Sequence, residues 1–263
     1  MSRLERVRAL VTGGTSGIGA AIVERLRSDG AEVVFTGRDE RRGYDVAERT
    51  GGSFVRADAR DPDHVRASVR AAVHALDGLD ALVANAGVIG DGPLSETTDE
   101  EWDVVLETNL VAPYLYAVAV LPALRRAGGG SITAISSDAG IWGETTIGAY
   151  SVSKRALNML VQTLAVEAGP HGIRVNAVCP GDTAPGMATT VQGRVATGDP
   201  AGWTVPPLGR VGTGADVAAA VSFFASPEAA FCNGALLLVD GGMRASLRAS
   251  AVAADPSSAK ART

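Results

Sequence analysis

Short apolar runs alternate with longer amphipathic segments along almost the whole chain. Seven short runs are rich in apolar or β-branched residues and predict strands, at residues 9–12, 32–36, 53–58, 81–85, 131–136, 174–179 and 236–240. The segments between them repeat apolar residues at helical spacing and predict helices, at residues 18–28, 63–76, 100–126, 149–168 and 215–225. Strands and helices that alternate in this way form a parallel sheet covered by helices on both faces. The pattern therefore predicts an α/β fold, a doubly wound, Rossmann-type sheet of seven parallel strands.

The same pattern predicts one folded domain. No change of composition and no Pro- or Ser-rich linker divides residues 1–243. Residues 182–208, rich in Gly, Pro, Ala and Thr, separate the sixth strand from the last helix, and so long a loop in a compact domain is usually functional. We expect this loop to form a lid over a substrate. Residues 244–263 are rich in Ala, Ser and Arg without periodicity, which predicts a flexible C-terminal tail.

Composition excludes several classes of function. With 263 residues, 46% of them hydrophobic and 20% charged, the chain can bury a sizeable core, which excludes a disordered protein. A formal net charge of -5 gives no general attraction to nucleic acid or to an anionic membrane surface. Two cysteines and three histidines, without metal-ligand spacing, predict neither a disulfide scaffold nor a zinc site.

The apolar stretches are too short for a signal peptide or a membrane span. The first is broken by Gly13 and Gly14, so it falls short of the ~7 apolar residues of a signal-peptide core. The longest, residues 110–124, is interrupted by Pro113 and Pro122 and falls short of the ~20 residues of a membrane span. We therefore expect a cytoplasmic protein without a membrane, nucleic-acid or metal partner.

Glycine is over-represented, and its positions point to a ligand. The 32 glycines make up about 12% of the chain, against a usual ~7%. In residues 9–20 a predicted strand leads through a glycine-rich turn into a predicted helix. The start of a helix offers unpaired N–H groups and a dipole to a pyrophosphate, and side chains in the turn would obstruct its approach. A tight turn without a ligand is the alternative. The candidate pyrophosphate-binding residues are Gly13, Thr15, Ser16, Gly17, Ile18 and Gly19.

The spacing of this turn, Thr-Gly-x-x-x-Gly-x-Gly at residues 12–19, resembles that of the short-chain dehydrogenase/reductase family. The resemblance covers about residues 5–243. It implies an NAD(P)-dependent oxidoreductase that interconverts a secondary alcohol and a ketone, and it implies a homotetramer or homodimer. Other landmarks of the family follow in order: Asn85-Ala86-Gly87, Asn109, Ser137, Tyr150 with Lys154, Pro180-Gly181 and Val239-Asp240-Gly241-Gly242.

The end of the second predicted strand indicates which nucleotide is bound. An acidic residue there binds the ribose 2′-hydroxyl of NAD, whereas a nearby arginine accommodates the 2′-phosphate of NADP. Here the acidic position is Gly37, followed by Arg38, whose guanidinium fork suits a phosphate. Arg41 and Arg42 add positive charge, so we expect NADP(H) ahead of NAD(H). The alternatives are a solvated basic start of a helix, and Asp39 turned toward the ribose.

The resemblance extends the cofactor site to three further strand ends. It assigns Asp58 and Ala59 to the adenine ring, Asn85, Ala86 and Gly87 to the nicotinamide-side ribose, and Pro180 and Gly181 to the nicotinamide end. From the sequence alone, Asp58 is equally a cap for the helix after Pro62. The family often has a threonine four residues after this glycine, but that residue is Pro185 here. Thr183 is the expected substitute in holding the nicotinamide carboxamide.

Tyr150 and Lys154 are the candidate proton-transfer pair. They lie four residues apart in a segment of helical periodicity, so both project from one face. A free tyrosine has a pKa of about 10, and a neighbouring ammonium favours its phenolate, which can then act as a general base. Without its context, the same spacing is also typical of an ordinary amphipathic helix. Both residues are expected to contact the cofactor as well.

Ser137 and Asn109 complete the expected catalytic set. Ser137 ends the fifth predicted strand, where its hydroxyl can bind the substrate oxygen, and Ser136 is the competing candidate. Asn109 lies inside an apolar helix, where an amide is costly unless it is hydrogen-bonded, so a satisfied core residue is one interpretation. The resemblance instead gives Asn109 a water that relays protons to Lys154.

The loops after the fourth, fifth and sixth strands are expected to contact the substrate. Several carboxylates together with two tryptophans suit a polyhydroxylated or cationic small molecule, unless the acids point into water. A 3-oxoacyl thioester on a carrier protein is the alternative, although Arg125 and Arg126 form only a small basic patch for such an acidic partner. An alternative of another class is a non-catalytic dinucleotide-sensing protein. The candidate substrate residues are Asp138, Trp142, Glu144, Asp182, Met187 and Trp203.

Overall fold

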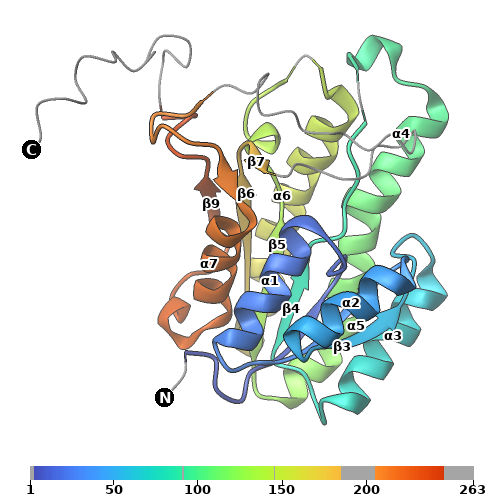
Figure 1. The fold of residues 1–263 in the computed structure, drawn as a ribbon, viewed down its shortest axis with the longest axis vertical. Helices are drawn as coiled ribbons and strands as arrows, with labels where there is room; N and C mark the ends of the chain where they lie inside the picture. Colours follow the sequence, from blue (N-terminus) through green and yellow to red (C-terminus); the bar gives the residue numbers. More distant parts are fainter. Residues whose placement is uncertain (1–2, 91, 145, 185–204, 246–263) are drawn as a thin grey trace, which may run out of the picture.

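The chain folds into a seven-stranded parallel sheet between two layers of helices (Figure 1). This computed structural model describes residues 3–90, 92–144, 146–184 and 205–245. Every neighbouring pair of strands in the sheet is parallel. The predicted fold class is therefore confirmed, with one strand at each of the seven predicted places. In spatial order the strands are β3 (Ser53–Arg56), β2 (Glu32–Gly37), β1 (Arg8–Val11), β4 (Ala81–Ala84), β5 (Gly130–Ile135), β6 (Ile173–Pro180) and β9 (Leu236–Val239).

Helices bury both faces of this sheet. On one face pack α3 (Pro62–Ala75), α5 (Ala112–Arg126) and α6 (Gly148–Ala168), and on the other pack α1 (Gly17–Ser28), α2 (Glu40–Thr50) and α7 (Gly214–Ala225). Successive side chains of a strand point to opposite faces, so each strand feeds two hydrophobic cores. This is why the strands read as continuous apolar runs in the sequence.

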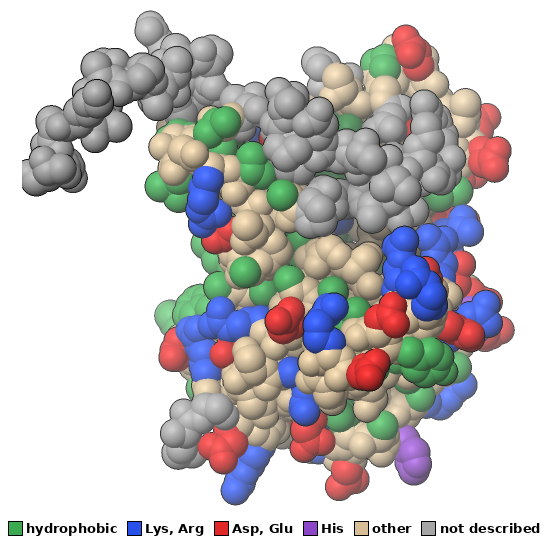
Figure 2. Space-filling view, in the orientation of Figure 1, with side chains coloured by type: hydrophobic (Ala, Val, Ile, Leu, Met, Phe, Trp, Pro, Cys, Tyr) green, Lys and Arg blue, Asp and Glu red, His purple; other side chains and the backbone are tan. Residues whose placement is uncertain are grey.

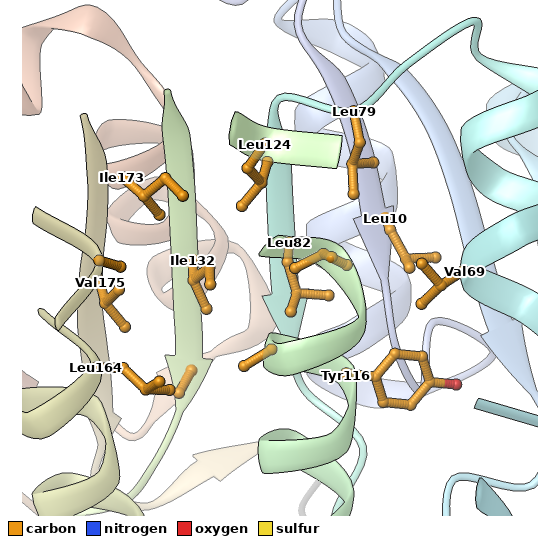
Figure 3. Close-up of a cluster of buried hydrophobic side chains, with 14 of the residues drawn as sticks. Leu10, Val69, Leu79, Leu82, Tyr116, Leu124, Ile132, Leu164, Ile173 and Val175 are labelled. Atoms are coloured by element: carbon orange, nitrogen blue, oxygen red, sulfur yellow. The ribbon is translucent and has the colours of Figure 1, made fainter. Parts of the chain in front are cut away.

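The core under α3, α5 and α6 is built from rows of strand residues in register (Figure 3). Leu10 of β1 pairs with Leu82 of β4, Leu82 with Ile132 of β5, and Ile132 with Val175 of β6. All four side chains are almost completely buried. Tyr116 of α5 belongs to the same core and is 1% exposed. Burial of a large apolar side chain stabilises a fold by about 1.5–3 kcal/mol, so this register is strongly specified.

Two helical regions differ from the prediction. α2 was not expected as a helix because its sequence is mostly charged and buries only Gly43 and Val46, which gives no apolar stripe. The helix predicted at residues 100–126 is divided into α4 (Asp99–Leu106), a π-helical turn (Glu107–Val111) and α5. A π-helical turn carries one extra residue, and apolar periodicity alone does not reveal it.

Helical residues Asp99–Arg126 form a stretch long and apolar enough to cross a membrane, judged by length and composition alone. In the structure this stretch packs along the sheet. Its residues Tyr116, Val120 and Leu124 are at most 1% exposed and belong to the core of Figure 3. The core therefore accounts for much of its apolar character.

The region predicted as a lid is described only at its ends. Residues 183–184 form β7 (Thr183–Ala184), which pairs with β8 (Gly212–Thr213) just before α7. Residues 185–204, which include Met187 and Trp203, lie outside the described residues. At the C-terminal end, Arg244 belongs to the described structure, although the sequence assigned it to the predicted tail.

Candidate active site

The predicted site residues follow the carboxyl ends of the strands. The sheet order places β1 next to β4, and chain connections leave in opposite directions from these two strands. In open α/β sheets, ligands bind outside the carboxyl ends of the strands at such a switch point. The glycine-rich turn follows β1 at this point, and the catalytic candidates follow β4, β5 and β6.

The glycine-rich turn has a shape that only glycine allows. Gly13 and Gly17 have positive φ angles, 65° and 51°. A Cβ added to Gly13 would lie 2.8 Å from the Ala86 Cα, and one added to Gly19 would overlap the Gly13 carbonyl oxygen. Ser16, which begins α1, makes no capping hydrogen bond through its side chain within the described structure. The turn and the open helix start therefore fit a pyrophosphate group.

A set of hydrogen bonds holds this turn against the end of β4. The Thr12 hydroxyl oxygen accepts hydrogen bonds from the backbone N–H groups of Asn85 and Ala86, both at 3.0 Å. The Asn85 side-chain amide donates to the carbonyl oxygens of Thr12 at 3.0 Å and Gly13 at 2.9 Å. The Asn85 amide nitrogen thus donates both of its hydrogen bonds to the turn. Asn85 therefore stabilises the turn, in addition to its predicted contact with a ribose.

The end of β2 leaves Arg38 facing solvent. A Cβ at Gly37 would overlap the Thr15 side chain, so the position usually taken by an acidic residue is closed to one here. The Asp39 carboxylate caps α2 by accepting from the Arg42 N–H at 3.0 Å, and it also lies 3.3 Å from the Arg42 guanidinium. Asp39 is therefore engaged, which argues against the alternative that it turns toward a ribose. Arg38 is exposed beside the turn.

The end of β3 clarifies the role of Asp58. The cap of α3 is Asp61, which accepts from the N–H groups of Asp63 at 2.8 Å and His64 at 3.3 Å. The alternative that Asp58 caps this helix is therefore wrong. Among the described residues the Asp58 carboxylate has only Arg60 as a partner, through its backbone N–H at 3.0 Å and its guanidinium at 4.0 Å, and both Asp58 and Ala59 are half-buried.

Tyr150 and Lys154 lie one turn apart on α6 and are both buried, at 6% and 2% exposure. The Lys154 ammonium is 5.5 Å from the centre of the Tyr150 ring and donates a hydrogen bond of 2.8 Å to the Ile135 carbonyl. Burial lowers the pKa of Lys154 to about 8. Burial raises the pKa of Tyr150 to about 12; a hydrogen bond with Ser137 opposes this rise, and the charge of Asp138 adds to it.

Ser137, not Ser136, adjoins the Tyr150 hydroxyl. The buried Ser136 hydroxyl donates to the backbone carbonyl of Lys154 at 3.3 Å. Ser137 begins a short 3-10 helix, η3 (Asp138–Gly140), and its oxygen accepts from the Ala139 N–H at 3.1 Å. Its hydroxyl donates to Asp138 Oδ1 at 3.1 Å and lies beside the Tyr150 hydroxyl. The structure thus brings Ser137, Tyr150 and Lys154 together at the end of β5.

Asn109 lies in the π-helical turn and is completely buried. Its amide accepts from the Val88 N–H at 2.9 Å and donates to the Val88 carbonyl at 2.9 Å and the Ser153 hydroxyl at 3.0 Å. Both N–H groups of the Asn109 amide have hydrogen-bond partners. This agrees with the interpretation of Asn109 as a core residue whose polar groups are satisfied. Its oxygen keeps a second lone pair, so the proton relay stays a prediction.

Gly87 leaves space between Asn109 and Lys154. A Cβ at Gly87 would lie 3.3 Å from Asn109 Oδ1 and 3.6 Å from Lys154 Nζ. The two polar side chains therefore face the same place beside the end of β4. A side chain at residue 87 would fill that place.

The end of β6 holds the next three cofactor candidates, Pro180, Gly181 and Thr183, close to β9. A Cβ at Gly181 would lie 2.9 Å from the Asp240 Cβ, so glycine allows the two chain segments to approach. The Thr183 hydroxyl donates to the Gly181 carbonyl at 2.8 Å and is buried. Pro185 lies outside the described residues. Pro180, the last residue of β6, is buried beside Gly181.

The predicted substrate acids are not all free. Arg244 contacts both Asp138, at 3.0 Å between Nε and Oδ2, and Glu144. Burial and the charges of Asp138 and Glu144 raise the pKa of Asp182, while Arg244 lowers it. Trp142 is 44% exposed near this group. The interpretation of these acids as a site for a cation is therefore weakened, because Arg244 already pairs with two of the three carboxylates and offsets one of their two charges.

Two further features concern chemistry. Cys179 is buried, and burial raises the pKa of its thiol to about 11, so it is no nucleophile near neutral pH. Within the part of the chain that the structure describes, no group of three or more His, Cys, Asp or Glu residues is arranged to hold a metal ion.

Sequence reasoning missed three residues that shape this site. Thr12 stands before the first glycine of the turn in the sequence motif, but its hydroxyl can accept a hydrogen bond from Asn85 only because the end of β4 lies beside it. Ser153, which bonds Asn109, gave no signal. Arg244 gave none either, because it lies 106 residues from Asp138 in the chain.

Comparison with known proteins gives matches over almost the whole chain. A family model described as enoyl-(acyl carrier protein) reductase matches residues 13–244. Cyclopentanol dehydrogenase from Comamonas sp. (strain NCIMB 9872) is 36% identical over 255 residues, which are 93% of this chain and 100% of the relative.

Two further relatives carry other substrates in their names. 2-(S)-hydroxypropyl-CoM dehydrogenase 3 from Xanthobacter autotrophicus is 34% identical, over 93% of this chain and 99% of the relative. 3-oxoacyl-(acyl-carrier-protein) reductase FabG from Vibrio cholerae is 34% identical, over 91% of this chain and 98% of the relative. All three names describe oxidoreductases.

Proposed function

The chain belongs to the short-chain dehydrogenase/reductase family of oxidoreductases, and from that premise we propose which residues perform its interconversion of a secondary alcohol and a ketone. Tyr150 gives the proton to, or takes it from, the substrate oxygen, and Ser137 holds that oxygen by a hydrogen bond. Lys154 stabilises the Tyr150 phenolate. The observation that carries this proposal is the Ser137–Tyr150 contact with the Lys154 ammonium 5.5 Å from the Tyr150 ring.

Charge decides how the tyrosine works. Burial holds the pKa of Tyr150 at about 12, too high for a base near neutral pH. The cation on Lys154 persists up to a pKa of about 8, and an ammonium at this distance favours the phenolate. The neighbouring Ser137 hydroxyl favours the same form. We expect Asn109 to complete the path through a proton relay across the space left by Gly87.

A nicotinamide cofactor fits the same edge of the sheet. When bound, it supplies the carbon that accepts or gives the hydride. The glycine-rich turn and the start of α1 would hold its pyrophosphate, Asp58 and Ala59 its adenine, and the residues after β4 and β6 its nicotinamide half.

NADP(H) is proposed ahead of NAD(H). Among the described residues near the end of β2, Arg42 is paired with Asp39 and Arg41 with Asp45, at 3.3 and 3.4 Å. Arg38 has no carboxylate within 4.0 Å in the described structure and is exposed, so its fork is available to a phosphate. Arg38→Asp should raise the dissociation constant for NADPH at least tenfold and leave that for NADH less affected. An unchanged ratio of the two constants would refute the preference.

The substrate is proposed to be a small secondary alcohol or ketone. A polyhydroxylated molecule keeps Asp182 as a carboxylate partner, whereas a cationic one is less favoured because Arg244 already pairs with Asp138 and Glu144. A 3-oxoacyl thioester is the second candidate, favoured by the similarity to the FabG reductase. On the face drawn in Figure 2, basic and acidic side chains are interspersed, without the broad basic patch that an acidic carrier would need.

The assembly and location are proposed as a cytoplasmic homotetramer or homodimer. The described helices leave apolar side chains at least 40% exposed on α5 and α6, a feature of surfaces that another subunit covers. They are Tyr114 and Val118 of α5 and Val152, Met159 and Val166 of α6. Light scattering coupled to size-exclusion chromatography would measure the state directly, and a monomer at micromolar concentration would refute it.

A substrate screen tests the reaction itself. Cyclic and linear ketones, sugar ketones and a carrier-protein thioester would be offered with NADPH and NADH, and the corresponding alcohols with the oxidised cofactors, read at the nicotinamide absorbance. Tyr150→Phe should lower kcat, measured at saturating cofactor, about 10²–10⁴-fold, since that is the usual contribution of a general acid or base. Near-normal turnover by this variant would refute the role of Tyr150. Tight NADPH binding by the wild type without any turnover would instead indicate a dinucleotide sensor.

A further inference from the structure

Arg244 reaches the catalytic serine loop from the far end of the chain. A turn anchored by Asp240 positions it: the Asp240 carboxylate accepts from the N–H groups of Gly242 at 2.9 Å and Arg244 at 2.8 Å. Gly241 and Gly242 both have positive φ angles, 65° and 87°, which a turn of this shape requires. The Arg244 backbone is thus fixed at the end of β9 and is not a free chain end.

The Arg244 side chain joins two carboxylates across the site. Its Nε donates to Asp138 Oδ2 at 3.0 Å, and its Nη2 contacts Glu144. The side chains of Arg244 and Asp138 are only 20% and 15% exposed, so solvent screens this pair less than a surface ion pair. The second oxygen of Asp138 accepts from the Ser137 hydroxyl at 3.1 Å. A continuous chain of polar contacts therefore runs from Arg244 through Asp138 to Ser137.

Resting on the proposed function, we propose that Arg244 is a positioning residue for proton transfer, which acts by neutralising Asp138 beside Ser137 and Tyr150. Unpaired, the Asp138 carboxylate would be a partly buried charge next to both groups. It would hold the Ser137 proton more strongly, and that proton is the one Ser137 needs to donate to the substrate oxygen. It would also oppose formation of the Tyr150 phenolate.

The charges around Tyr150 support this reading. The polar groups around Tyr150 are Ser137 and Asp138 after β5, Cys179 of β6, and Lys154 one turn along α6, whose ammonium lies over the ring. Of these, Asp138 carries the negative charge near neutral pH, because the Cys179 thiol has a pKa of about 11. Asp138 raises the pKa of Tyr150, and Lys154 is the cation beside it. Arg244 supplies a second positive charge that offsets Asp138.

The test is the pH profile of alcohol oxidation, in which Tyr150 must accept a proton and kcat rises as pH passes its apparent pKa. In Arg244→Met the acid limb should move upward by about 0.5–1 pH unit, which corresponds to a fall of about 3–10-fold in kcat on that limb. KM should change little, because the effect is on the proton and not on binding. Arg244→Lys keeps the charge and should keep the limb close to that of the wild type.

A second substitution separates charge from structure. Adding Asp138→Asn to Arg244→Met removes the carboxylate that Arg244 is proposed to offset, so the acid limb should return to or below the wild-type position. A limb that stays shifted in the double variant would mean that Arg244 only holds the chain end in place, and would overturn the proposal. Arg66→Met removes an arginine from an exposed ion pair with Asp63 on α3 and serves as the matched control, with an unchanged profile expected.

Folding and the proposed function are checked in the same experiment. Each variant's thermal midpoint and NADPH affinity, from the quenching of tryptophan fluorescence, establish that it is folded and binds the cofactor. Wild-type protein without turnover would refute the proposed function, and this inference with it. Wild-type turnover with an unshifted profile in Arg244→Met would refute this inference alone.

Discussion

Thr12→Val tests whether one hydroxyl joins the cofactor turn to the sheet. Valine keeps the shape of threonine but cannot accept hydrogen bonds, so the N–H groups of Asn85 and Ala86 lose the partner that they have at 3.0 Å. Thr12 itself is 2% exposed, which leaves little room for water to replace its oxygen. The change thus leaves two donors unsatisfied while preserving the apolar contacts.

The expected cost follows from those two donors. A buried donor left without a partner costs about 1–3 kcal/mol. Because Asn85 and Ala86 are only half-buried, the lower part of that range applies, so the two together cost about 2–3 kcal/mol. For a chain of this length, that loss lowers Tm by about 4–12 °C. The turn would also be held less firmly, so NADPH affinity should fall.

Urea unfolding followed by circular dichroism measures the stability change, with an unchanged m-value as the sign that the unfolded state is not altered. Thr12→Ser is the matched control, since it keeps the hydroxyl and loses one methyl group, at a cost of about 1 kcal/mol. A Thr12→Val protein as stable as Thr12→Ser, with unchanged NADPH affinity, would show that the hydroxyl does not hold the turn.

Two further variants follow from the geometry of the site. Burial lowers the pKa of Lys154 to about 8, so the folded protein binds this proton less tightly than the unfolded chain does. The buried ammonium therefore destabilises the folded protein fully below about pH 8, and this effect disappears above the ordinary lysine pKa of about 10.4. Removing the ammonium in Lys154→Met should then raise the free energy of unfolding, measured in urea, more at pH 7 than at pH 10.5. An equal effect at both values would contradict a buried ammonium. Gly19→Ala should abolish NADPH binding measured by calorimetry, because its methyl group overlaps the Gly13 carbonyl oxygen. Gly143→Ala, whose added carbon has no heavy atom of the described residues within 4 Å, should bind normally. Binding by Gly19→Ala at wild-type affinity would refute the assigned turn.

The fold was predictable because the sheet is buried on both faces. Strands such as Ala81–Ala84 consist of apolar residues alone, so they are easily recognised as strands in the sequence. α2 was not recognised as a helix, because a helix that buries only Gly43 and Val46 has almost no apolar stripe to detect. The signal for α2 is instead its capping residue, Asp39.

The site was predictable where neighbours in the sequence are also neighbours in space. Tyr150 and Lys154 share one helix face, so their spacing already implied their proximity. The contact between Arg244 and Asp138 depends on the pairing of β6 with β9, which brings distant ends of the chain together. No local pattern encodes such a contact, so the sequence overestimated the free negative charge of the substrate loops.

The π-helical turn at Glu107–Val111 determines whether the chain tolerates the deletion of a residue in this region. In a helix each residue turns the chain by about 100°, so the extra residue sets the rotation of α5 relative to α4. Deleting one residue there would give the backbone a regular helix, yet it would turn either Asn109 away from Val88 or Tyr116 out of the core. After such a deletion the backbone could still form a regular helix, but the side chains of Asn109 and Tyr116 could not both keep their contacts. We therefore expect single-residue deletions at 107–111 to be lethal to the fold or the site.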